Sequence, residues 1–149
     1  MKLEDYIRKY LAEGRMLQVA TSADGQPWIC TVYYVTDQDN NIYWLSYPER
    51  RHSQEIEKNP QVAAAIAIKF EDKPVIGLQV EGKVDTIQDA AIVKSVMDDY
   101  VAKYDSGKEF YINFTVGTNK HKLYKLTSEL FVLFDEVNFP NNSRQEWRP

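Results

Sequence analysis

The chain has 149 residues, of which 44% are hydrophobic and 27% charged, and this suits a single soluble domain spanning residues 1–149. The net charge of −4 argues against a broad nucleic-acid-binding face, and no apolar run approaches the ~20 residues of a membrane helix. A single cysteine allows no intrachain disulfide, and the N-terminus lacks the apolar stretch of a signal peptide, so we expect a cytoplasmic protein.

The first part of the chain predicts one helix followed by a β-meander. Apolar residues recur at helical spacing up to a glycine that is typical of a helix end, Gly14. Asp24-Gly25 is a hairpin signal between the first two strands. The apolar helix positions are Leu3, Tyr6, Ile7, Tyr10 and Leu11, and the three strands are Met16 to Ser22, Trp28 to Thr36 and a strand that begins at Ile42.

The second part of the chain alternates strands with shorter helical pieces. A short helix, Ser53 to Lys58, ends before Asn59-Pro60. The alanines in "QVAAAIAIKF" favour a helix, but its position after the proline favours a short buried strand. The remaining predicted elements are a strand from Val75 to Ile87 with glycines at 77 and 82, a helix from Gln88 to Tyr104, a loop with a brief strand around Phe110 to Phe114, and final strands from His121 to Thr127 and Glu129 to Val137.

These elements predict a mainly β, α+β fold. Six or seven antiparallel strands, an N-terminal helix and one longer inserted helix are typical of a small β-barrel. Interior glycines in the strand from Val75 to Ile87 indicate bulges or close backbone contacts, as at a barrel corner.

The loop from Ser46 to Ser53 is the best site candidate, because it places two arginines and a histidine between a strand and a helix start. One interpretation is a solvated turn in which Ser53 is the helix N-cap and two glutamates follow early in the helix. The other is an anion site, because arginine binds phosphate through two N–H groups and a helix N-terminus adds unpaired N–H groups. The residues alone leave both interpretations open.

The rest of the sequence shows no clear metal site, nucleophile or phosphate-binding motif. His52 and His121 are the only histidines, and neither has a second ligand at zinc spacing, so we expect no metal site. Cys30 lies in an apolar strand without an evident base, which favours a small buried side chain over a nucleophile. The phosphate-binding glycine loops and the nucleophile elbow are both missing from the sequence.

An ordered series of segments resembles the FMN-binding split β-barrel family, the pyridoxamine 5′-phosphate oxidase-related proteins. The series is "LQVATSADGQPWICTVYYV", then "IYWLS", then "RRHSQEIEKNPQVAAAI", then "LQVEGKV" followed by a helix. The resemblance covers most of the chain up to about Tyr104. It implies a six- to seven-stranded split β-barrel and a homodimer with FMN at the subunit interface.

The resemblance also implies which residues bind FMN. The family's hydroxyl at the strand end corresponds to Ser46, and the basic pair before the helix corresponds to Arg51 and His52. Arg51 is then expected to be the main phosphate ligand, and Arg50 to point to solvent. One strand is expected to line the flavin ring, a residue on the next strand, just before Ser46, to face the ring, and a later strand to reach it. These cofactor-binding positions are Cys30, Thr31, Val32, Leu45 and Gln79.

Two positions depart from the family pattern. The pyridoxamine phosphate oxidases place an arginine where this chain has Cys30 and a lysine where it has Val35. Because two phosphate-directed cations are absent, oxidation of vitamin B6 itself is not expected.

The sequence therefore predicts an FMN-dependent oxidoreductase that acts on an unknown small molecule, with no nucleic-acid or membrane partner. No convincing catalytic side chain is evident, which is compatible with hydride transfer directly at the flavin. Two alternatives belong to other classes. One is a non-catalytic protein that binds or senses flavin or heme, and the other is a dimeric relative without a cofactor.

Overall fold

A computed structural model describes residues 1–105, 108–115 and 120–149. Within these residues, eight strands form one antiparallel sheet and four helices lie against it or beside it. The elements are α1 (Leu3–Glu13), β1 (Met16–Ala23), β2 (Gln26–Tyr33), β3 (Val35–Thr36), β4 (Ile42–Ser46), α2 (Arg51–Lys58), β5 (Gln61–Lys69), β6 (Ile76–Ile87), α3 (Ala90–Tyr104), α4 (Lys108–Thr115), β7 (Lys122–Asp135) and β8 (Arg144–Trp147).

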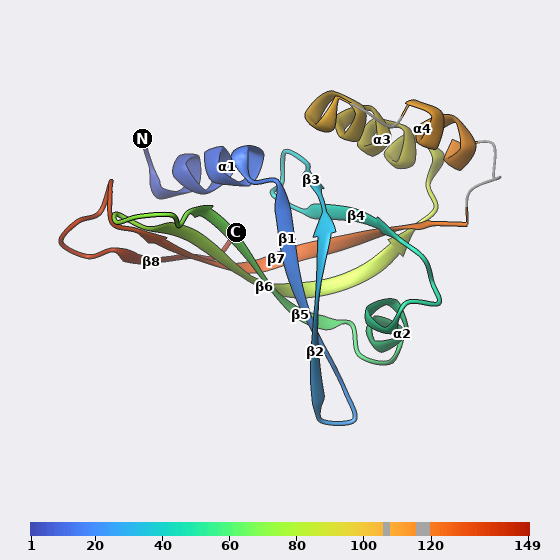
Figure 1. The fold of residues 1–149 in the computed structure, drawn as a ribbon, viewed down its shortest axis with the longest axis horizontal. Coiled ribbons are helices and arrows are strands. Elements are labelled where there is room, and N and C mark those ends of the chain that lie inside the picture. The colour runs from blue at the N-terminus through green and yellow to red at the C-terminus, as the bar shows by residue number, and fades with distance from the viewer. Residues whose placement is uncertain (106–107, 116–119) are drawn as a thin grey trace.

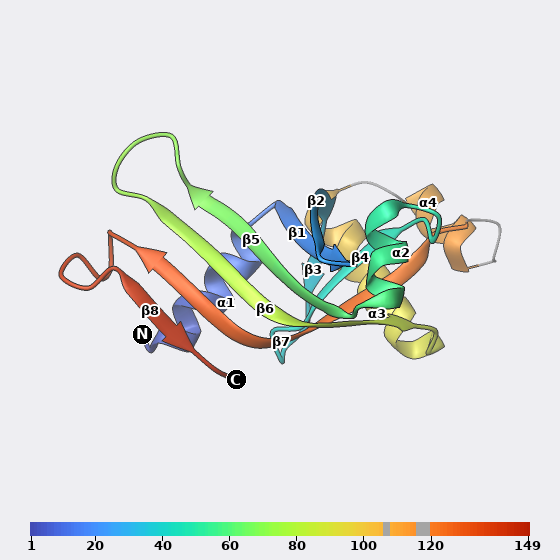
Figure 2. The same cartoon turned by 90° about the horizontal axis from the view of Figure 1, so that it is seen from below.

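The strand order is β2-β1-β5-β6-β7-β4-β3, with β8 paired to β7. The sheet is strongly curled, and β1 and β2 run steeply across the direction of β7 (Figure 1). Seen from below, β5, β6 and β7 are long neighbouring strands with β8 beside β7 (Figure 2). The predicted split β-barrel of the α+β class is confirmed, with eight described strands in place of six or seven.

The main core lies between α1 and the curled sheet. Ile7, Tyr10 and Leu11 of α1 are buried against it, and Gly14 is the C-cap residue, as the spacing predicted. A β-carbon on Gly14 would collide with the hydroxyl of Tyr34, so only glycine fits this helix end. Burying the apolar stripe of α1 is what holds the helix on the sheet.

A second, smaller cluster holds α3 on the other part of the sheet. It contains Val96 of α3 together with Val35, Tyr43 and Leu123 of the strands below. Figure 1 shows α3 and α4 above the part of the sheet that contains β3 and β4. Among the described residues, none of the helices combines the length and apolar character that a membrane span needs.

The alanine-rich segment forms strand β5 and not a helix, but it is buried on one face only, as is its neighbour β6. Burial alternates along both strands, so one face is packed and the other is open. The register shifts by one residue between the Glu81–Leu130 and Gly82–Ser128 pairs. A β-carbon on Gly82 would collide with the carbonyl oxygen of Thr127, so this glycine permits the close approach of β6 and β7.

The two final strands of the sequence prediction form one strand in the structure. Strand β7 runs without a break from Lys122 to Asp135. The predicted gap at Ser128 coincides with the register shift opposite Gly82. A local irregularity in the pairing was thus interpreted as a strand end.

The brief strand predicted around Phe110 to Phe114 is wrong, because helix α4 occupies these residues. Phe114 packs against the second cluster, and this tertiary contact outweighs the β-propensity of aromatic residues. The predicted loop around the strand included residues 106–107 and 116–119, which lie outside the described residues.

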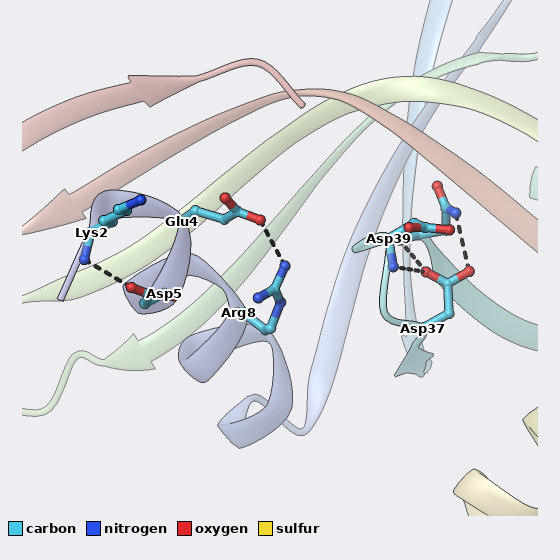
Figure 3. A network of polar contacts seen from close by, with 7 residues as sticks. Lys2, Glu4, Asp5, Arg8, Asp37 and Asp39 are labelled. Carbon is cyan, nitrogen blue, oxygen red and sulfur yellow. Dashed lines mark hydrogen bonds and ion pairs between the residues drawn. The ribbon is translucent and has the colours of Figure 1, made fainter.

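Two aspartates organise local structure, one at a helix start and one in a turn (Figure 3). At the start of α1, Asp5 accepts a hydrogen bond of 2.9 Å from the backbone N–H of Lys2. In the turn between β3 and β4, Asp37 accepts hydrogen bonds of 2.9 Å from the N–H groups of Asp39 and Asn41. These carboxylates satisfy backbone donors that a helix start and a tight turn leave unpaired.

Candidate functional site

A cavity of about 640 Å³ lies where β2, β4, the start of α2 and α3 meet. This volume is within the range of about 300–1,000 Å³ that is usual for sites of small molecules and cofactors. The described residues that line it are Arg15, Thr31, Val32, Tyr33, Leu45, Ser46, Tyr47, Arg50, His52, Met97, Tyr100, Val101, Tyr104 and His121.

The lining of this cavity is basic, although the protein has a net charge of −4. Two arginines and two histidines line it, and the described lining residues include neither aspartate nor glutamate. A recess lined by one sign of charge concentrates ligands of the opposite sign. The cavity therefore favours an anionic ligand.

Ser46 and His52 form a buried pair at one end of the cavity. Ser46 is the last residue of β4, and its Oγ lies 2.7 Å from Nε2 of His52 in the first turn of α2. Burial, and secondarily the charge of Arg50, lowers the pKa of His52, while Glu55 opposes the shift. His52 is therefore neutral at pH 7, and its tautomer decides whether Ser46 donates or accepts the hydrogen bond.

Helix α2 begins earlier than the sequence prediction placed it. Arg50 is the N-cap residue in place of Ser53, which is buried within the helix. The earlier start puts His52 in the first turn, beside the unpaired N–H groups of the helix N-terminus. This position lets the helix start and the Ser46–His52 pair face the same cavity.

Arg50 forms a basic and aromatic corner with the residues around it. Its guanidinium lies 5.5 Å from the ring centre of Tyr47, and that ring lies 3.9 Å from the ring of His121. Burial lowers the pKa of His121, and the charge of Arg50 lowers it further. Tyr47, Arg50 and His121 are named here the Arg50 corner.

Arg51 is held on the other side of the helix start and does not line the cavity. Its Nε donates a 2.7 Å hydrogen bond to Glu55, and its guanidinium lies 4.1 Å from the Trp28 ring. Glu55 also accepts a 2.8 Å hydrogen bond from Thr21, and the contact with Arg51 is the main reason that the pKa of Glu55 is lowered. Arg51 thus ties α2 to β1 and β2, and its role as a phosphate ligand stays a prediction.

The structure brings five of the eight predicted cofactor positions together around the cavity and leaves three outside. Cys30 is half-buried against the main core, and burial raises its pKa to about 11. Gln79 lines a different cavity of about 360 Å³, over β5 and β6. The three residues outside the first cavity are therefore Cys30, Gln79 and Arg51. The five that line it are Thr31, Val32, Leu45, Ser46 and His52.

Sequence reasoning missed the wall that α3 contributes. The hydroxyl of Tyr100 lies 2.9 Å from the carbonyl oxygen of Tyr33 and 3.1 Å from that of Tyr43. The hydroxyl of Tyr104 lies 2.6 Å from the carbonyl oxygen of Tyr34 and accepts a 3.0 Å hydrogen bond from its N–H group. These contacts anchor α3 where the predicted strand Trp28 to Thr36 breaks into β2 and β3.

A family model described as pyridoxamine 5′-phosphate oxidase matches residues 3–126. The chain belongs to the pyridoxamine 5′-phosphate oxidase family. In this member of the family, the matched residues include every described residue of the cavity lining. The family resemblance predicted from sequence is confirmed.

One curated relative of this pyridoxamine 5′-phosphate oxidase family member is the UPF0306 protein plu4501 of Photorhabdus laumondii subsp. laumondii, which is 31% identical over 80 residues. The alignment spans 52% of this chain and 56% of that protein, so it covers about half of each.

Solved structures with the same fold bear different descriptions. A conserved hypothetical protein of Mycobacterium tuberculosis, Rv2991, has a TM-score of 0.79 at 16% identity, over 94% of this chain and 89% of that one. The heme storage protein HutZ of Vibrio cholerae has a TM-score of 0.65 at 24% identity, over 87% and 92%. An FAD-binding protein of Mesorhizobium loti has a TM-score of 0.67 at 18% identity, over 87% and 90%. At these identities the likeness shows the fold alone.

Proposed function

We propose that the chain, as one domain spanning residues 1–149, binds FMN in the cavity of about 640 Å³ and acts as an oxidoreductase on a small molecule. The observation that carries the proposal is the convergence of Ser46, His52 and Arg50 on one basic cavity beside the edge of β2. Bound FMN supplies the electron-transfer chemistry, and the protein supplies binding, orientation and electrostatics.

The end of the cavity near α2 fits a phosphate group. Arg50 offers a guanidinium fork, Ser46 a hydroxyl and His52 a ring nitrogen, and the first turn of α2 adds N–H groups. These are the donor types that phosphate sites use. We assign the phosphate to this end, with Arg50 as a ligand alongside Ser46 and His52.

The edge of β2 fits a flat heterocycle. Strand β2 is at the end of the sheet order and pairs only with β1 among the described strands. Thr31, Val32 and Tyr33 of this strand line the cavity, and Leu45 faces it from β4. A strand edge presents N–H and C=O groups in a row, which match the alternating donors and acceptors of an isoalloxazine ring.

The same edge supports a homodimer with the flavin at the interface. Trp28, Ile29 and Tyr33 of β2 are large side chains with 43%, 61% and 60% of their surface exposed. An exposed apolar edge strand is a liability in an isolated protein, and a second copy related by a twofold axis would cover it. Such a dimer has two equal sites.

Reduction of the bound flavin tests the activity. Protein loaded with FMN is mixed with NADH or NADPH without oxygen, and its absorbance is followed. We expect the flavin band to bleach and to return when air is admitted. A bound flavin that dithionite bleaches, while both nicotinamide donors leave it unchanged, would favour a non-catalytic binding protein.

A heme-binding protein is the second candidate, and one observation favours it. His52 and His121 both line the cavity, and burial lowers the pKa of each, so both imidazoles are neutral as metal ligation requires. Two structural neighbours, HutZ and a protein of Mycobacterium smegmatis, are described as heme-storing and heme-binding. A Soret band in the purified protein would support this candidate over the flavin.

A further inference from the structure

We infer that Arg15, Tyr104 and Lys103 form a second anion subsite of the cavity, which binds the carboxylate of a planar aromatic substrate. The inference deepens the proposed function, since it names the substrate class for the same cavity. Arg15 and Tyr104 line the cavity, and Lys103 adds a second positive charge, with its Nζ 5.5 Å from the Tyr104 ring centre. These three residues are named here the Arg15 subsite.

Arg15 is positioned by contacts that leave most of its donors available. Its guanidinium lies 4.7 Å from the ring centre of Tyr104, and one terminal nitrogen donates a 3.1 Å hydrogen bond to the carbonyl oxygen of Lys103. The hydroxyl of Tyr104 lies 2.9 Å from the carbonyl oxygen of Arg15. A guanidinium has five N–H donors in a fixed fork, so the stacked group can still take a carboxylate through two of them.

The positive charge of the subsite has no carboxylate partner among the described residues. The ion pairs of the described chain involve neither Arg15 nor Lys103. Lys103 lies 3.8 Å from the Tyr34 ring centre and 5.5 Å from that of Tyr104. Burial, and then the charge of Arg15, lowers the pKa of Lys103 to about 8. An anion placed here would relieve the repulsion between two neighbouring cations.

The Arg15 subsite and the Arg50 corner are separate groups that face one cavity. Arg50 is the N-cap residue of α2 and its guanidinium lies over the Tyr47 ring, whereas Arg15 contacts Tyr104 and Lys103 at the end of α3. FMN carries its negative charge on a single phosphate, so one cationic end is enough for it. The second cationic end therefore points to a second ligand with its own anionic group.

The wall of the cavity indicates the shape of that second ligand. The rings of Tyr33 and Tyr104 meet edge to face at 5.1 Å between their centres. Tyr33, Tyr100 and Tyr104 all line the cavity, together with the apolar side chains of Met97 and Val101. Aromatic and apolar walls next to a guanidinium suit a flat ring that carries a carboxylate.

Nicotinate and nicotinamide test the subsite because they share one ring and differ in charge. Each is titrated at pH 7 into the wild-type protein with and without FMN, and binding is followed by NMR. The same titrations are made with Arg15→Gln and with Arg8→Gln, a matched change at an exposed arginine on α1. Arg15→Lys serves as a rescue variant, and FMN affinity is measured for every protein.

We expect wild type and Arg8→Gln to bind nicotinate about tenfold or more tightly than nicotinamide, because one charged hydrogen bond changes affinity by that factor. Arg15→Gln should lose this preference, and Arg15→Lys should recover part of it. Equal binding of the two probes, or a preference that survives Arg15→Gln, would overturn the inference. If wild type ignores FMN but shows an Arg15-dependent preference, the subsite stands and the proposed flavin function falls.

Discussion

Arg50 and Arg51 are neighbours in sequence, but they make different contacts in the structure. Arg50 lines the cavity and lies over Tyr47, whereas Arg51 is engaged by Glu55 and the ring of Trp28. To reach a phosphate in the cavity, Arg51 would have to leave an ion pair and an aromatic contact. The sequence prediction assigned the phosphate to Arg51 and solvent to Arg50, and it stays a prediction; our proposal assigns the phosphate to Arg50 because of these contacts.

Arg50→Ala should weaken binding of FMN by about ten- to a hundredfold, which is the effect of one lost charged hydrogen bond. Riboflavin has no phosphate, so its affinity should change much less. Isothermal titration of both ligands into both variants measures the difference. Arg51→Ala is the matched comparison, and a selective loss of FMN affinity in Arg51→Ala but not in Arg50→Ala would restore the sequence assignment.

His52 should make FMN binding depend on pH. Burial and Arg50 hold its pKa below the ordinary 6.5 in the free protein, Glu55 opposes them, and Ser46 is its hydrogen-bond partner. A phosphate dianion stabilises imidazolium and raises this pKa in the complex. Binding therefore takes up protons between the two pKa values, and FMN affinity falls as pH rises through that window.

The pH test begins at neutral pH, because the phosphate itself loses its second proton at about pH 6 and is a dianion above that. FMN titrations of wild type and His52→Gln are compared from there upward. Wild type should lose affinity as pH rises, and the neutral amide should hold a constant affinity. Parallel curves would mean that His52 stays neutral in the complex.

At the scale of elements, the two glycines of β6 should respond differently to substitution. Gly82→Ala drives a β-carbon into the carbonyl oxygen of Thr127 and the side chain of Leu126, and should cost about 1–3 kcal/mol of unfolding free energy. Gly77→Ala is the control, since its β-carbon would meet only the Ile66 carbonyl oxygen at 3.6 Å. Urea denaturation measures both variants, and equal destabilisation would contradict the assigned role of Gly82.

Most elements were predictable because their local patterns agree with their tertiary environment. The stripe of α1, the Asp24-Gly25 turn and the predicted strand from Val75 to Ile87 all match the structure. Asp24 and Gly25 both have positive φ, as this hairpin turn requires. The errors arose where distant contacts decide the outcome, as for α4, whose Phe114 packs on the second cluster.

At the scale of the whole molecule, the exposed edge of β2 predicts a homodimer in solution. Ile29→Lys places a charge on a side chain that is 61% exposed, so it should dissociate the dimer without unfolding the chain. Phe70→Lys is the control, because Phe70 is 66% exposed but lies beyond the end of β5. Light scattering measures the mass of each protein.

The expected result is a dimer for wild type and Phe70→Lys, and a monomer for Ile29→Lys. A wild-type monomer at micromolar concentration would contradict both the dimer and the interface site. If Ile29→Lys stays dimeric, the interface lies on another face.

The site was predictable only in the part that comes from consecutive segments. Ser46 and His52 stand six positions apart, and their strand–loop–helix context is visible in the sequence. Arg15 and Tyr104 lie far apart in the chain, and only the docking of α3 beside the end of α1 brings them to one cavity. No short sequence pattern predicts a contact between such distant residues, so the side of the cavity formed by Arg15 and α3 could not be anticipated.

The most direct test of the central claim is the identity of the ligand that the protein carries. The purified protein is denatured, the released small molecules are identified by mass spectrometry, and the refolded or ligand-free protein is titrated with FMN. We predict release or uptake of FMN in an amount equal to that of the chain. Release of heme, or protein that carries no flavin and does not bind added FMN, would contradict the account.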